Sequence, residues 1–94
     1  MRFSVGMWYV YMLKCADGTF YCGSTNDLVK RLDAHNTKKS GAHYTKIRRP
    51  VVLVYSQRVR TYARAREREA ELKRMTRAEK LAFVASNKKT LKAN

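Results

Sequence analysis

Residues 8–23 read WYVYMLKCADGTFYCG, and this stretch decides the fold. It begins with eight mostly apolar residues, many of them aromatic or β-branched (8–15), a composition typical of a strand. An Ala-Asp-Gly turn sequence follows at 16–18, and a second strand-like segment covers 19–23. Two such segments separated by a short glycine-containing turn predict a β-hairpin.

The length of the hairpin loop determines which side chains share a face of the sheet. A three-residue loop with Gly18 in the left-handed conformation is a common connection, and it pairs Leu13 with Tyr21 and Tyr11 with Gly23. A two-residue loop would shift the register by one residue and put Tyr11 on the face opposite Tyr21. We expect the three-residue loop, which places the two tyrosines on one face because directly paired residues share a face.

The rest of the chain predicts one further strand and three helices. We expect a helix over 27–35 capped by Thr25 or Asn26, a polar basic loop over 36–50, a strand over 51–55, a helix capped by Thr61 and running to about 74, and a last helix from the capping box Thr76–Glu79 to about 84. The fold class is therefore α/β in the broad sense (α+β). It consists of a small three-stranded, mostly antiparallel sheet flanked by helices, in the order β-β-α-β-α-α. We expect one domain over 1–94, with its core over about 8–84 and a frayed basic tail over 85–94.

The charge of the chain is large and unevenly distributed. The 94 residues include 21 Lys+Arg and 7 Asp+Glu, a net charge of +14. Residues 1–27 are neutral overall, whereas 28–49 carry +6 and 58–80 carry +5. A neutral hairpin followed by basic segments indicates a phosphate-binding surface, with DNA as the expected partner and RNA also possible. A solvated helix face is the plainer alternative, but four glutamates cannot neutralise the nine cations of 58–80.

Several other classes of protein are disfavoured. No uninterrupted apolar run approaches the ~20 residues of a spanning helix, so we expect no membrane insertion. The first residues lack the long apolar segment of a signal peptide. Two cysteines, Cys15 and Cys22, are best interpreted as small buried side chains in a reducing compartment. The expected location is the cytoplasm, at the nucleoid, with a monomer as the default state.

One acidic residue lies where an apolar residue is expected. In the helix over 61–74 the inward stripe contains Tyr62, Ala65, Glu69 and Leu72, and the same spacing continues to Thr76. A carboxylate on a core-facing stripe needs a partner, because an isolated buried charge is unfavourable. A structural salt bridge to an arginine is the commoner explanation, and a metal ligand or general base is the functional one.

Four other side chains complete the parts of a phosphodiesterase site. His35 shares an inward helical stripe with Leu28 and Leu32, and Arg31 lies four residues before it. An arginine stabilises charge that develops on a phosphate, a carboxylate holds a divalent cation, and a tyrosine or histidine accepts a proton from water. Each residue alone has a plainer structural explanation. Together with Tyr11, Tyr21 and Glu69 they form a coherent set.

The ordered series of motifs resembles the GIY-YIG nuclease superfamily, and above all its small stand-alone bacterial branch. The segments that carry the resemblance are Tyr9-Val10-Tyr11, Gly18 to Asp27 (GTFYCGSTND), Arg31 to Asn36 (RLDAHN), Tyr44-Thr45-Lys46 with Arg49-Pro50, and Glu69 to Lys73 (EAELK). The resemblance covers about residues 8–84. Tyr9 stands where the first motif usually has glycine, and Cys22 replaces an aliphatic residue.

By position, the resemblance implies a role for each of six residues. Tyr11 and Tyr21 match the signature tyrosines and Gly23 the signature glycine, Arg31 matches the catalytic arginine, His35 a position that is His or Tyr in relatives, and Glu69 the metal-binding glutamate. It further implies hydrolysis of DNA with Mg²⁺ (or Mn²⁺) on Glu69 and a tyrosine as general base. Which tyrosine serves is left open.

The expected DNA-binding side chains lie in the basic loop. They are Lys38, Lys39, Lys46, Arg48 and Arg49, which would contact backbone phosphates with little reading of sequence. The resulting prediction is a metal-dependent DNA endonuclease with little sequence specificity. The alternative is a non-catalytic nucleic-acid-binding module that retains the nuclease fold, and a weaker one is an RNA-associated basic protein.

Overall fold

The computed structural model describes the backbone of residues 7–93 and the side chains of residues 7–87. Its elements, in chain order, are β1 (Trp8–Cys15), β2 (Phe20–Thr25), α1 (Leu28–Thr37), α2 (His43–Lys46), β3 (Val51–Val59), α3 (Tyr62–Lys73) and α4 (Arg77–Ala93). The three strands form one antiparallel sheet in the order β2-β1-β3. The predicted α+β class and the order of elements are confirmed.

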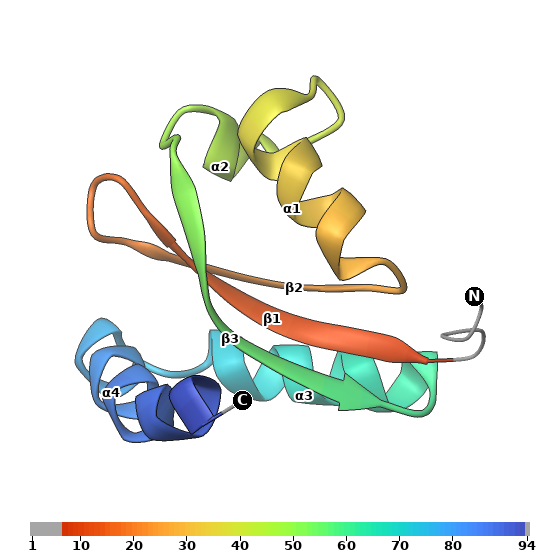
Figure 1. Cartoon of the computed structure of the whole chain (residues 1–94), viewed down its shortest axis with the longest axis vertical. Coiled ribbons are helices and arrows are strands. Elements are labelled where there is room, and N and C mark those ends of the chain that lie inside the picture. The colour runs from red at the N-terminus through yellow and green to blue at the C-terminus, as the bar shows by residue number, and fades with distance from the viewer. Residues whose placement is uncertain (1–6, 94) are drawn as a thin grey trace.

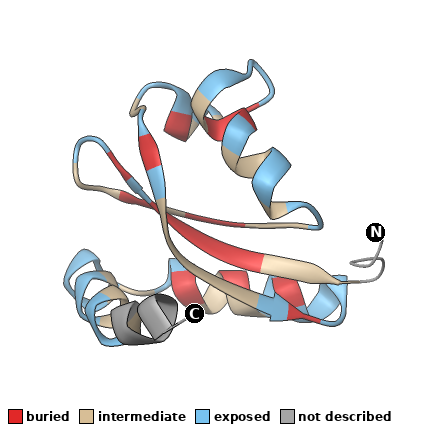
Figure 2. Ribbon diagram, in the orientation of Figure 1, coloured by how far each residue is buried: buried red, intermediate tan, exposed pale blue. Residues whose placement is uncertain are grey.

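The sheet is the middle layer of three. In Figure 1, α1 and α2 lie on one side of the sheet, and α3 and α4 lie on the other. Alternation along β1 sends Val10 and Met12 to the core beneath α3, whereas Tyr11 and Leu13 point to the core beneath α1. Figure 2 shows buried positions concentrated along the middle of β1. No helix in the described part of the chain has the length and apolar character to cross a bilayer.

The hairpin has the predicted register. Gly18 has φ +85°, and its amide donates to the Cys15 carbonyl at 2.9 Å. The left-handed conformation costs glycine little, and it closes the three-residue loop. Tyr11 consequently pairs with Gly23, and Leu13 pairs with Tyr21.

The ends of three predicted elements were wrong. Asp27 caps α1, accepting from the Lys30 amide at 3.1 Å, while the Thr25 hydroxyl supports the Asp27 amide. The strand predicted over 51–55 is longer, because β3 continues its ladder with β1 as far as Val59 opposite Trp8. The predicted loop over 36–50 contains the last turn of α1 and the four-residue helix α2.

The predicted cap of α3 and the predicted capping box of α4 are confirmed, but the last helix is longer than predicted. Thr61 caps α3, and Thr76 and Glu79 exchange backbone and side-chain hydrogen bonds at the start of α4. α4 then continues to Ala93, so the tail predicted to fray from 85 onward is helical. The lysines of that tail (88, 89 and 92) have side chains outside the described residues.

Candidate active site

Residues from both sides of the sheet meet at the edge of β2. An open hollow of about 390 Å³ is lined by Trp8, Tyr11, Tyr21, Gly23, Ser24, Arg31, Tyr62, Arg66 and Glu69. β2 is an edge strand, so α1 can present Arg31 from one side of the sheet while α3 presents Glu69 from the other. The structure thus brings together four of the five predicted catalytic side chains around one hollow. The fifth, His35, lies directly behind Tyr11.

Tyr11 and His35 belong to a buried hydrogen-bond chain. The Tyr11 hydroxyl lies 2.8 Å from His35 Nε2, and His35 Nδ1 lies 2.7 Å from Thr45 Oγ1. Thr45 Oγ1 donates its proton to the Ala42 carbonyl at 2.9 Å, so it accepts from Nδ1–H. The Nε2 atom of His35 is then an acceptor, and the Tyr11 hydroxyl donates to it. His35 and Thr45 are fully buried, and Tyr11 is 2 % exposed.

Burial sets the protonation of this chain. It raises the pKa of Tyr11 to about 12, against an opposing effect of the Arg31 guanidinium. Burial also lowers the pKa of His35 to about 4, and the charges of Arg31 and Arg49 add to that shift. At neutral pH the chain therefore holds a neutral phenol donating to a neutral imidazole. The nearby Arg31 guanidinium therefore does not make Tyr11 a phenolate at neutral pH.

Gly23 is required by the approach of Tyr11. A Cβ atom on residue 23 would lie 2.5 Å from the Tyr11 hydroxyl oxygen and 2.8 Å from Cζ. Tyr11 cannot move away without breaking its hydrogen bond to His35. The glycine therefore leaves room for the phenol at the edge of the sheet.

Tyr21 and Arg31 form the wall of the hollow on the α1 side. The Tyr21 ring packs against His35 at 5.0 Å and against Tyr44 at 5.9 Å between ring centroids. Arg31 projects from α1, and its Nη1 atom donates to the Ser40 carbonyl at 3.1 Å. One hydrogen bond to a backbone carbonyl leaves most of the five N–H donors of the guanidinium for a ligand.

Glu69 is the buried acid of the site, 8 % exposed. Its Oε1 atom accepts from the Ser24 hydroxyl at 2.8 Å, and its Oε2 atom lies 2.7 Å from Lys73 Nζ. Burial tends to raise the pKa of Glu69, but the hydrogen bonds from Lys73 and Ser24, together with the charges of Lys73 and Arg66, outweigh it and hold the pKa below its usual value. Glu69 is therefore an anion at neutral pH.

A magnesium ion fits this donor set if water completes its coordination. The described residues contain no group of three or more His, Cys, Asp or Glu side chains placed to share a metal. Mg²⁺ is commonly held by one or two carboxylates and retains several waters. Glu69 offers such a carboxylate at an open hollow, and its Lys73 partner is 54 % exposed and free to turn away. The residues present are thus compatible with one hydrated cation at Glu69.

The five basic side chains predicted to bind DNA do not line this hollow. Arg49 donates to the carbonyls of His35, Ala34 and Lys38 at the end of α1. Arg48 pairs with Asp17 at 3.0 Å and donates to the Tyr44 carbonyl. Both arginines therefore hold the fold together. The three lysines are more exposed: Lys46 Nζ donates to the Lys39 carbonyl, and Lys38 lies 3.8 Å from Asp33.

Sequence reasoning missed Ser24, Thr45, Arg66 and Lys73. Signals existed for Ser24, which alternates with Gly23 on β2 and so faces α3, and for Lys73, which lies one turn after Glu69. Thr45 had no such signal, because it reaches His35 from the short helix α2. Tyr62, expected to point inward, is 51 % exposed at the rim.

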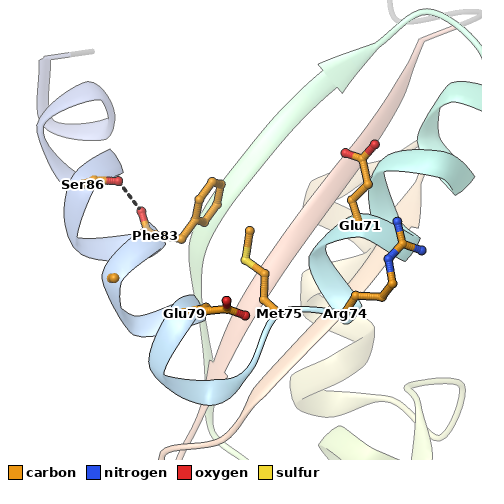
Figure 3. A pocket seen from close by; sticks show the side chains of 7 residues that line it. Glu71, Arg74, Met75, Glu79, Phe83 and Ser86 are labelled. Atoms are coloured by element: carbon orange, nitrogen blue, oxygen red, sulfur yellow. Dashed lines mark hydrogen bonds between the residues drawn. The ribbon is translucent and has the colours of Figure 1, made fainter.

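A larger hollow, of about 640 Å³, lies between α3 and α4 but has a different character (Figure 3). Met75 and Phe83 give it apolar walls. Its acids are already engaged: Glu71 pairs with Arg68, and Glu79 accepts from the Thr76 amide. Nothing there forms a set of groups suited to catalysis.

Comparison with known proteins gives one consistent result. The family model described as the GIY-YIG catalytic domain matches residues 7–82. A UPF0213 protein of Syntrophus aciditrophicus is 49% identical over 79 residues, covering 84% of this chain and 91% of the relative. A UPF0213 protein of Streptococcus agalactiae is 45% identical over 80 residues, covering 85% of this chain and 90% of the relative.

Two solved structures share the fold. The solution NMR structure of a UPF0213 protein from Bacillus halodurans is 35% identical, with a TM-score of 0.54, and the match covers 84% of this chain and 83% of that one. The solution NMR structure of a protein from E. faecalis is 34% identical, with a TM-score of 0.57, and the match covers 85% and 84% of the two chains.

Proposed function

The chain belongs to the GIY-YIG catalytic domain family, and on that premise we propose that it is a metal-dependent endonuclease that hydrolyses DNA phosphodiester bonds with little sequence specificity. One observation carries the proposal: Tyr11, Tyr21, Arg31 and Glu69, from β1, β2, α1 and α3, surround a single hollow. A module that only binds nucleic acid has no use for a buried acid there.

Arg31 is the group that holds the phosphate to be cleaved. Its guanidinium reaches the hollow from α1 and has donors left over after its hydrogen bond to the Ser40 carbonyl. Hydrolysis adds negative charge to the phosphate oxygens as water attacks. A fixed guanidinium beside those oxygens stabilises the transition state more than the ground state.

The Tyr11–His35 pair removes the proton of the attacking water. Tyr11 oxygen accepts that proton while its own proton passes along the 2.8 Å hydrogen bond to His35 Nε2. His35 is neutral beforehand, so its lone pair is available, and its Nδ1–H remains bonded to Thr45. This transfer needs no free phenolate, which the raised pKa of Tyr11 makes scarce at neutral pH. Tyr21, whose ring centroid lies 6.5 Å from that of Tyr11 on the same face of the sheet, orients the water.

Glu69 is the residue that would hold Mg²⁺ or Mn²⁺, with Ser24 fixing one carboxylate oxygen. The bound cation supplies stabilisation of the charge on the phosphate and on the leaving 3′ oxygen. We expect weak sequence specificity because the basic side chains at the hollow would contact the DNA backbone. Arg31 and Arg66 at the hollow would contact phosphates, which carry no sequence information. We extend the proposal to the place of action, the nucleoid in the cytoplasm.

Cleavage of a panel of labelled nucleic acids tests the proposed function. Single-stranded, duplex, flap and branched DNA, with matched RNA, are incubated with the protein and Mg²⁺ or with a chelator. We expect cleavage of at least one DNA with Mg²⁺ and none with chelator, and the same loss of cleavage for Arg31→Met. Binding to the panel with no cleavage of any member would instead establish the non-catalytic binding module.

A further inference from the structure

One face of α3 presents two cations on either side of the buried acid. Arg66, Glu69 and Lys73 stand at i, i+3 and i+7, which puts them on a single stripe. Arg66 and Glu69 line the hollow beside Tyr11, and the same two residues with Lys73 line a second, smaller hollow of about 140 Å³ directly beside it. The stripe is therefore continuous with the site, although the proposed hydrolysis does not use its two cations.

The Arg66 guanidinium lies near an aromatic ring but has no acidic partner among the described side chains. Among the side chains of 7–87 it makes no ion pair or hydrogen bond, and it is exposed. Its Cζ atom lies 5.9 Å from the centroid of the Tyr62 ring, and Tyr62 in turn packs on Trp8 at 4.8 Å. The aromatic pair supports the cation at the rim without neutralising it.

Lys73 pairs with the acid of the site but keeps donors for a further anion. Its Nζ atom lies 2.7 Å from Glu69 Oε2, the carboxylate that would hold the divalent cation. One contact to Glu69 leaves two of the three ammonium donors of Lys73 for an anion, whether or not a metal is bound. The lysine side chain is 54 % exposed, so it can turn toward a phosphate beside the site.

The opposite face of α3 shows that this arrangement is particular to the stripe. There Arg64 pairs with Glu67 at 3.0 Å, and Arg68 pairs with Glu71 at 2.9 Å, so each cation has its own acid. On the stripe two cations share a single acid. A surface with excess cations beside a phosphate-cleaving hollow is suited to further phosphates.

The distance between Arg66 and Lys73 along α3 suits the spacing of phosphates in one nucleic-acid strand. Arg66 and Lys73 are seven residues apart, about 10 Å along the helix at a rise of 1.5 Å per residue. Phosphates on either side of a given phosphate are separated by two nucleotide steps, about 7 Å along a duplex axis and more along an extended strand. Long, flexible Arg and Lys side chains accommodate that range.

We propose that Arg66 and Lys73 bind the two backbone phosphates that flank the cleaved one, so that the substrate strand runs along α3. This inference rests on the proposed nuclease function and gives the substrate a path. The main phosphate contacts are then made by α3, the helix that carries Glu69, and not by the basic loop over 36–50.

Salt-dependent binding tests the path. A fluorescein-labelled DNA oligonucleotide is titrated, in chelator so that nothing is cleaved, with wild type, Arg66→Met, Lys73→Met and the control Arg64→Met. The control removes one charge from the other face of the same helix. We expect each stripe variant to bind about fivefold to tenfold more weakly at about 0.1 M salt, and to lower the slope of log K against log salt by about 0.7 to 0.9, the value of one phosphate contact.

Binding and cleavage are scored separately. The path is wrong if the stripe variants bind within twofold of Arg64→Met, and cleavage by wild type with Mg²⁺ would then leave the nuclease function standing. Selective loss of binding in the stripe variants supports the path even if the protein cleaves nothing. No salt-dependent binding by wild type also overturns the path, and cleavage by wild type with Mg²⁺ then decides separately whether the nuclease function stands.

Discussion

At Tyr11, the placement that makes the phenol useful also holds its proton in place. The ring is almost fully buried against Gly23, and its hydroxyl donates to His35. Burial raises the pKa of the phenol to about 12 and lowers the pKa of the imidazole to about 4. Neither group alone is an effective base at neutral pH, because the phenol keeps its proton and the imidazole is only weakly basic. The pair accepts a proton through a preformed hydrogen bond, which is the role that we assign to it.

Replacing His35 by Gln separates the hydrogen bond from the proton transfer. The amide oxygen of Gln accepts from Tyr11, and its NH₂ group donates to Thr45, but the side chain cannot take up a proton. We expect cleavage by His35→Gln to fall by about 10²- to 10⁴-fold, the usual contribution of a general base, with binding of DNA in chelator unchanged. Single-turnover rates measure this loss. A variant that cleaves as fast as wild type would exclude His35 as the proton acceptor.

The same histidine makes stability depend on pH in a defined direction. The folded pKa of about 4 lies below the usual 6.5, so the unfolded chain binds more protons between these two values. The free energy of unfolding therefore falls as pH drops from 6.5 toward 4, by on the order of 3 kcal/mol from this group. Thermal melts across that range should show a steeper loss for wild type than for His35→Gln. Parallel curves would contradict the protonation state assigned to His35.

At the scale of elements, local sequence determines the turn and the caps, whereas tertiary contacts determine lengths. Gly18 set the register that pairs Tyr11 with Gly23, and Glu69 was recognisable as an acid on an apolar helical stripe. The four-residue helix α2 and the polar end of β3 exist through packing and strand pairing, so their sequences carried no adequate signal.

The contacts made by side chains of the basic loop over 36–50 likewise could not be predicted from local sequence. Arg48 and Arg49 have the composition of a DNA contact, but the carbonyls at the end of α1 and the carboxylate of Asp17 bind them instead. A helix leaves its last carbonyls without partners, and a nearby guanidinium satisfies several at once. Only the folded chain places those acceptors beside the arginines.

We therefore expect Arg49 to contribute more to stability than to DNA binding. Arg49→Met removes hydrogen bonds to three carbonyls, and we expect a loss of about 2 kcal/mol, which lowers the melting temperature by roughly 10 °C in a domain of this size. Lys39→Met removes the same charge from an exposed position and serves as the control. Melting curves with DNA titrations distinguish the two roles. An unchanged melting temperature with much weaker DNA binding in Arg49→Met would contradict this assignment.

At the scale of the whole molecule, the fold brings two opposite layers to one edge. Helices α1 and α3 lie on different faces of the sheet (Figure 1), yet Arg31 and Glu69 line the same hollow because β2 ends the sheet between them. The chain has a net charge of +14, which favours an anionic partner, and two of its cations, Arg31 and Arg66, line this hollow. A small three-layer module can in this way present an arginine and a carboxylate to the same hollow.

The measurement that tests this account most directly compares Glu69→Gln with Glu67→Gln. Both substitutions remove one carboxylate from α3, but Glu67 is exposed and pairs with Arg64 away from the hollow. The initial cleavage rate of the preferred DNA is measured with Mg²⁺ for both variants and wild type, and binding is measured in chelator. We predict about a thousandfold loss for Glu69→Gln with binding retained, since charge stabilisation at the phosphate contributes several kcal/mol, and near wild-type rates for Glu67→Gln. Equal cleavage by the two variants would show that the chemistry does not occur at this hollow.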